Sequence, residues 1–118
     1  MAKKRKNKLL RGKFYASYPN GGHPALIFNK NKRKNRYDAV VFGTTEGRHR
    51  TKLDKPISDK VSKSVIHNRP IRGVRKDFGD KEFSNLKVDP GDKPKIKIVK
   101  RRIPQETKRY KELKNKKP

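Results

Sequence analysis

Two apolar runs dominate this sequence, Gly22–Phe28 and Tyr37–Thr45, and the segment between them, 29–36, is polar and mostly basic. Only 29% of the residues are hydrophobic, far below the near-half that is usual in globular chains. The two runs must therefore supply much of any core that forms. Two apolar runs around a short charged segment are typical of two antiparallel strands joined by a hairpin. We predict one small domain at 9–99, organised around this pair.

The charge of the chain predicts its class of partner. Lys and Arg number 36 against 11 Asp and Glu, which gives a net charge of +25. Such an excess repels itself and opposes compaction unless an anion neutralises it. A polyanion is the expected partner, with nucleic acid (RNA or DNA) first and an anionic membrane second. No apolar run reaches the roughly 20 residues of a membrane span, and no stretch has the wide apolar face of a membrane-surface helix, so we expect no membrane partner.

The absence of Cys excludes disulfides, zinc–thiolate sites and a cysteine nucleophile. It is compatible with a reducing compartment. We expect a cytoplasmic protein or one held within a nucleoprotein particle.

Alternation and turn residues predict the strands. In the stretch 9–18, Phe14, Ala16 and Tyr18 fall on one face and Tyr15 and Ser17 on the other. The turn signal at 19–22 contains Pro and two Gly. Further strands are predicted at 23–28, 37–43, 64–68, 71–77 and 94–99, and one or two helical turns at 80–86.

Many short strands with frequent Gly and Pro turns indicate a mostly β fold, a small antiparallel barrel. Basic segments flank it: an arm at 1–8 and a tail at 100–118. Pro104 is a candidate first-turn residue for a helix in the tail.

Seventeen basic residues are candidates for contacts with nucleic-acid phosphates, because such contacts position a protein without reading sequence. The alternative is a solvated face that only keeps the chain soluble. The candidates are Lys3, Lys4, Arg5, Lys6, Lys32, Arg33, Lys34, Arg36, Arg48, Arg50, Arg69, Arg72, Arg75, Lys76, Lys100, Arg101 and Arg102.

A cluster of hydroxyl, guanidinium and imidazole side chains follows the second apolar run, in the loop 44–51. Arg binds phosphate in a bidentate manner, and a histidine serves as a general base or acid near neutral pH. The cluster fits either a loop that binds phosphate without cutting or an RNA-cleaving site. In the second case the catalytic candidates are Thr44, Thr45, Arg48 and His49.

Two other groups, one of acidic residues and one of histidines, are interpreted as structural rather than as metal sites. Asp77, Asp80 and Glu82 lie close in sequence and could hold Mg²⁺, but with Lys81 among them we interpret them as local charge balance. The three histidines have no metal-ligand spacing, and His67, in an apolar context, is interpreted as structural. We expect no metal and no cofactor.

The segments Gly21–Phe28 and Ala39–Thr45 resemble the MazF/PemK toxin family, over roughly 10–88 of this chain. The resemblance implies an SH3-like barrel, a homodimer, neutralisation by an antitoxin and metal-independent endoribonuclease activity. Thr44 or Thr45 would match the catalytic hydroxyl of that family. One position departs from the pattern: the family carries a catalytic Arg before the Pro, and here His23 meets Pro24 directly.

Three hypotheses about function follow. The first is a small basic β protein that binds RNA or DNA through phosphates. The second is an endoribonuclease of the MazF/PemK type. The third is a structural part of a ribonucleoprotein or viral particle, whose partner is a large assembly. The first and third depend on the same electrostatics, so the residues do not separate them.

Overall fold

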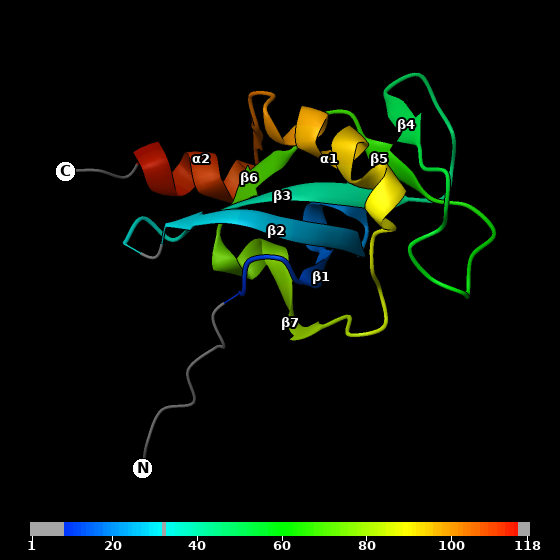
Figure 1. The fold of residues 1–118 in the computed structure, drawn as a ribbon. Helices are drawn as coiled ribbons and strands as arrows, with labels where there is room; N and C mark the ends of the chain where they lie inside the picture. The colour runs from blue at the N-terminus through cyan, green and yellow to red at the C-terminus, as the bar shows by residue number, and fades with distance from the viewer. Residues whose placement is uncertain (1–8, 32, 116–118) are drawn as a thin grey trace, which may run out of the picture.

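The computed structural model describes residues 9–31 and 33–115 (Figure 1). The predicted arm at 1–8, Lys32 and residues 116–118 lie outside the described residues. The strands are β1 (Phe14–Ser17), β2 (His23–Asn31), β3 (Arg36–Gly43), β4 (Arg50–Lys52), β5 (Val65–His67), β6 (Ile71–Gly73), β7 (Phe78–Glu82) and β8 (Gln105–Glu106). The helices are η1 (Tyr18–Asn20), η2 (Arg75–Asp77), η3 (Pro90–Asp92), α1 (Lys93–Lys100) and α2 (Lys108–Asn115).

The mostly β, antiparallel character predicted from the sequence is confirmed. Along the sheet the order is β4-β5-β3-β2-β1-β7, with β6 also on β3 and β8 parallel to β6. The two ends of this path, β4 and β7, do not pair with each other among the described strands, so the sheet stays open where a closed barrel was expected. The three strands predicted nearest the start of the chain are all present, and β2 and β3 extend into the segment that we predicted as the hairpin tip.

Strand β3 is the centre of the molecule. One edge pairs with β2, and the other pairs first with β6 and then with β5, because Pro70 separates those two short strands. Alternation along β3 places Ala39 and Val41 in one apolar cluster and Val40 and Phe42 in another. Both faces of this strand are therefore buried, as the unbroken apolar run indicated.

Helix α1 occupies the segment 94–99, which we predicted as a strand, so that prediction was wrong. The Lys and Ile alternation there fits a strand, but Pro94 at the helix start and the spacing of Ile96 and Val99 also fit a helix. These two side chains are buried against the cluster around Phe42, while Ile98 is 55% exposed. Figure 1 shows α1 above β3, with β1 and β7 on the opposite side.

The helical turns predicted at 80–86 are also wrong. Residues 78–82 form β7, which pairs with β1 through Ser17 and Phe78 and through Tyr15 and Glu82. The segment forms a strand because the edge of β1 is free to pair with it. Hydrogen bonds to that edge satisfy backbone groups that a single helical turn would leave without partners. Of the strand predicted at 71–77, only β6 is extended, and the rest is η2.

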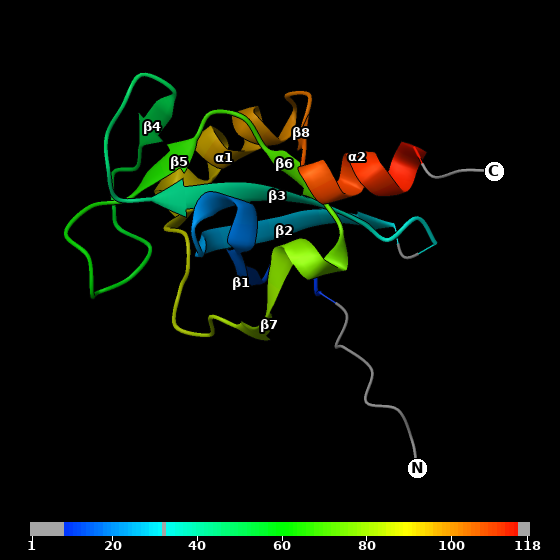
Figure 2. The same cartoon turned by 180° about the vertical axis from the view of Figure 1, so that it is seen from behind.

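The C-terminal segment joins the sheet. Gln105 N and Thr107 N donate to the carbonyls of Pro70 and Arg72, at 2.8 Å each, and α2 follows at once, which confirms the helical segment (Figure 2). The helix begins at Lys108, a few residues after Pro104.

Three buried aspartates bind segments that are distant in sequence. Asp38 accepts two hydrogen bonds from Arg72, at 2.8 and 3.1 Å. Asp77 accepts from Val74 N at 2.9 Å and from the Thr107 hydroxyl at 2.7 Å.

Asp92, fully buried, accepts from the backbone N–H groups of Asp54 and Lys55, at 2.8 and 3.0 Å. Burial alone would raise the pKa of this carboxyl, but these hydrogen bonds, together with one from Lys95, outweigh it and lower the pKa.

We predict that Gly73→Ala lowers the free energy of unfolding by about 1–3 kcal/mol. A Cβ at this position would lie 2.6 Å from Asp77 Oδ2. The carboxylate must then move away from Val74 N and the Thr107 hydroxyl. Chemical denaturation measures the effect.

Gly47→Ala is the matched control. There the nearest atom to the new Cβ is Arg50 Cγ at 3.6 Å, an ordinary contact. The control should stay within about 0.5 kcal/mol of the wild type, and equal losses in the two variants would contradict the role of the Asp77 carboxylate.

Candidate nucleic-acid interface

A hollow of about 710 Å³ lies between the β4–β5 hairpin and the segment that leads from α1 to β8. Four arginines converge on it from three parts of the chain, and no Asp or Glu among the described residues lines it. We call it the basic hollow. It is lined by Asn20, His49, Arg50, His67, Asn68, Arg69, Ile71, Arg101, Arg102, Ile103 and Gln105.

Hydrogen bonds across the basic hollow hold its two sides together. Arg102 Nη1 donates to the Asn68 carbonyl at 2.8 Å, and Arg69 Nε donates to the Ile103 carbonyl at 3.1 Å. On the β4 side, Asn68 N donates to the His49 carbonyl at 2.9 Å. The hollow is therefore a fixed feature of the fold, and its arginine side chains remain exposed at the surface.

The electrostatics of the basic hollow act on His67, which pairs with Arg50 across the β4–β5 ladder. Burial, and then the positive charge of Arg50 and the neighbouring His23, lower the pKa of His67 to about 4. The imidazole is thus neutral at physiological pH. The positive charge of the hollow comes from its guanidinium groups.

Several sequence-predicted candidates meet here. Arg50, Arg69, Arg101 and Arg102 all line the basic hollow, together with His49. They were predicted from three separate basic segments. The fold brings those segments together through β5, β6 and β8.

Two predicted phosphate contacts have structural partners instead. Arg72 donates to the buried Asp38 from both Nε and Nη2, and these hydrogen bonds raise the pKa of the guanidinium. Arg75 is 9% exposed and donates to the carbonyls of Phe78 and Gly79 and to Asp80. We therefore leave both residues out of the interface.

The remaining candidates lie elsewhere. Arg33 and Lys34 are on the β2–β3 turn beside α2, and Arg36 begins β3 with its Nε buried. Arg48 and Lys76 are exposed outside the basic hollow. Lys100 is exposed at the end of α1, with its Nζ 5.8 Å from the centre of the Phe28 ring. Lys3, Lys4, Arg5, Lys6 and Lys32 lie outside the described residues.

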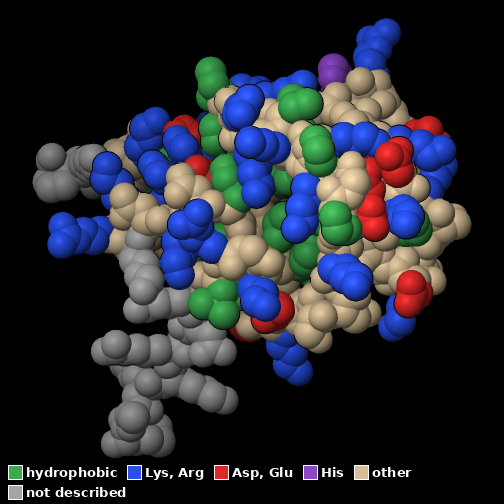
Figure 3. Space-filling view, viewed as in Figure 1, with side chains coloured by type: hydrophobic (Ala, Val, Ile, Leu, Met, Phe, Trp, Pro, Cys, Tyr) green, Lys and Arg blue, Asp and Glu red, His purple; other side chains and the backbone are tan. Residues whose placement is uncertain are grey.

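On the face seen in Figure 3, Lys and Arg side chains are spread over the whole surface, with acidic side chains gathered mainly at the right. The positive charge thus covers the surface broadly. The basic hollow differs from this background because its arginines surround a concave space.

The four residues proposed for catalysis are exposed but separated. Thr44 lines a second, apolar pocket, His49 lines the basic hollow, and Thr45 and Arg48 lie on the loop between. In the described part of the chain, no hydrogen bond joins the side chains of these four residues.

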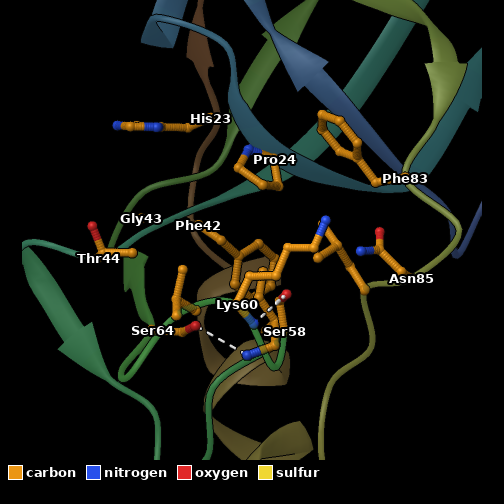
Figure 4. A pocket seen from close by; sticks show the side chains of 13 residues that line it. His23, Pro24, Phe42, Gly43, Thr44, Ser58, Lys60, Ser64, Phe83 and Asn85 are labelled. Atoms are coloured by element: carbon orange, nitrogen blue, oxygen red, sulfur yellow. Dashed lines mark hydrogen bonds between the residues drawn. The ribbon is translucent and has the colours of Figure 1, made fainter.

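The apolar pocket encloses about 260 Å³ beside β2 and the end of β3. Figure 4 shows the rings of Pro24, Phe42 and Phe83 around the space, with Lys60 and Asn85 beside it. The pocket is lined by His23, Pro24, Phe42, Gly43, Thr44, Ile57, Ser58, Lys60, Val61, Ser64, Phe83, Asn85 and Leu86.

Several of these pocket residues could not be predicted from the sequence. Lys60 and Asn85 are polar residues in irregular segments, and neither stands in a motif. Only the fold places them beside Pro24. In the basic hollow, Asn68 and Ile103 were missed for the same reason.

The acidic group Asp77, Asp80 and Glu82 is dispersed. Asp77 binds Thr107, Asp80 pairs with Arg75, and Glu82 lies 3.8 Å from Lys13. Within 9–31 and 33–115, no group of three His, Asp or Glu residues could hold a metal ion. In the same residues, no helix has the length and apolar character needed to cross a membrane.

Comparison of the chain with protein-family models, with curated proteins and with solved structures gave no match.

The lowered pKa of His67 predicts a pH dependence of stability. The pKa of an unfolded histidine is about 6.5, and that of folded His67 is about 4. Between these values the unfolded state binds more protons, so the free energy of unfolding falls as pH is lowered, by at most about 1.4 kcal/mol per pH unit for one proton. We predict that His67→Asn reduces this slope, measured by denaturation at several pH values.

Val88→Ala is the control, because it trims a partly buried side chain and leaves every imidazole in place. It should lower stability while retaining the wild-type slope. An unchanged slope in His67→Asn would show that His67 does not carry this pH dependence.

Proposed function

We propose that this protein binds nucleic acid, RNA or DNA, through the phosphate backbone, with the basic hollow as the principal contact surface. The observation that supports the proposal is the convergence of Arg50, Arg69, Arg101 and Arg102 on a concave surface without any lining carboxylate. Guanidinium groups bind phosphate oxygens in a bidentate manner.

The charge of the whole chain supports the same proposal. A net charge of +25 attracts a polyanion over long distances and speeds association. Neutralising phosphates releases condensed counterions, so the affinity must fall steeply with added salt. Such contacts position the protein without reading base sequence.

Binding is favoured here over cleavage. The endoribonuclease hypothesis needs Thr44, Thr45, Arg48 and His49 to act on one phosphate, and the first and last of these residues line different hollows. The hypothesis of a structural role in a ribonucleoprotein needs the same phosphate contacts as the proposal. Purification with and without nuclease distinguishes a free nucleic acid from a larger assembly as the partner.

We predict that the double variant Arg50→Gln/Arg101→Gln binds a short single-stranded RNA about tenfold more weakly than the wild type at moderate salt. Both side chains line the basic hollow, and neither bridges its two sides. The slope of log affinity against log salt should become shallower by about 1.4, since each lost contact on a single strand contributes roughly 0.7. Fluorescence anisotropy over a salt series measures both quantities.

Lys81→Gln/Lys87→Gln removes the same charge from exposed positions outside the basic hollow. Lys81 is in β7, on the opposite side of the molecule from β4 in Figures 1 and 2. This control should retain most of the affinity. Equal losses of affinity in the two double variants would mean that the charge acts diffusely. Binding without salt dependence would contradict the proposal.

A further inference from the structure

The apolar pocket and the basic hollow lie next to each other, with two histidine side chains between them. His23 lines the apolar pocket and His67 lines the basic hollow, and their rings lie edge to face with centroids 6.4 Å apart. Gly43 packs against both: a Cβ at this residue would lie 3.7 Å from His67 Nε2 and 3.9 Å from His23 Cδ2. A nucleic-acid strand with a phosphate in the basic hollow therefore has the apolar pocket within reach of a neighbouring nucleotide.

The size and lining of the apolar pocket suit one flat ring system. Its volume of about 260 Å³ is just below the range of about 300–1,000 Å³ typical of drug-sized ligands. The rings of Pro24 and Phe83 border the space, as Figure 4 shows, and the fully buried Phe42 lies behind it. Aromatic side chains stack on nucleobases of any sequence, because every base has a π face.

The polar groups of the apolar pocket suit the edge of a base. Thr44, Lys60 and Asn85 are exposed, and within the described residues their side chains have no hydrogen bond or ion pair with protein groups. Together they offer a hydroxyl, an ammonium and an amide, which donate to or accept from ring nitrogens and exocyclic groups. Ser64 differs from them, since its hydroxyl accepts from Ile57 N at 3.0 Å.

We infer that the apolar pocket takes one unpaired nucleobase of the strand whose phosphates lie in the basic hollow, so that the ligand is single-stranded. This inference rests on the proposed function. A base inside a duplex is stacked and paired, and its faces are not available to a pocket. Stacking beside Phe83 adds a contribution that depends on the base being present, on top of the phosphate contribution.

The test compares a short single-stranded RNA with an abasic chain of the same length and phosphate count. The wild type should bind the intact RNA about fivefold or more tightly than the abasic chain, the lower end of the effect of one stacked base. Phe83→Leu keeps an apolar side chain in the pocket but removes the aromatic face. In this variant the preference for intact RNA should disappear while binding of the abasic chain stays unchanged.

Phe28→Leu is the matched control. Phe28 packs against the same apolar cluster but does not line the pocket, so the preference should remain. If Phe83→Leu fails to fold, NMR on the wild type decides the question, because a bound nucleoside monophosphate must show contacts to the ring protons of Phe83. Their absence would overturn the inference, as would loss of the preference in Phe28→Leu.

The possible outcomes bear differently on this inference and on the proposed function. Equal binding of intact and abasic chains by the wild type, with a steep salt dependence, overturns the base pocket and leaves phosphate binding in place. Absence of binding to both chains overturns this inference, and absence of binding to a duplex as well overturns the proposed function. Competition by a duplex as strong as by the single strand also contradicts the inference.

Discussion

Buried carboxylates hold this fold together, and the rest of the structure depends on them. Asp38, Asp77 and Asp92 are at most 2% exposed, and each binds a group at least thirty positions away in sequence: Arg72, Thr107 and the backbone of Asp54. A buried charge costs several kcal/mol unless hydrogen bonds satisfy it. Here those hydrogen bonds join each aspartate to a segment that is distant in sequence. The buried carboxylates therefore determine how β6, the C-terminal segment and η3 lie on the sheet.

The placement of the acids also shapes the surface. Most of the remaining carboxylates pair with nearby cations, such as Glu46 with Lys63, Asp54 with Lys95 and Glu106 with Lys114. None of these pairs reaches the basic hollow. With three acids buried and these others paired elsewhere, the arginines around the hollow face one another without a carboxylate between them. Their mutual repulsion is the physical basis for proposing that an anion binds there.

The sequence predicted the centre of the fold well, because β1, β2 and β3 are unambiguous. Their side chains alternate between two buried clusters, and a turn with Gly21 and Gly22, both at positive φ, joins the first two strands. The segment of α1 was ambiguous, since Ile96 followed by Ile98 fits a strand while Ile96 with Val99 fits a helix. Burial of Val99 and exposure of Ile98 decided it, and burial depends on the whole fold.

The candidate site could be predicted only in part, for a related reason. Arg69, Arg72 and Arg75 look alike in the sequence, as cations along one extended segment. In the structure the first lines the basic hollow, the second pairs with Asp38 and the third is buried. Which of them meets solvent depends on strand register and on the long-range pairing of β6 with β8. Local composition contains neither, and it likewise could not show that Lys60 and Phe83 line the same pocket.

The open edge of the sheet at β4 has a consequence for how copies of the protein behave together. Among the described strands β4 pairs only with β5, and Arg50 and Lys52 place positive charge along its outer edge. Such charges keep edge strands of separate molecules apart. A bound polyanion would neutralise the same charges. If the proposed binding to nucleic acid holds, solubility should depend on the ratio of protein to nucleic acid: copies should condense where the opposite charges balance and disperse where either component is in excess.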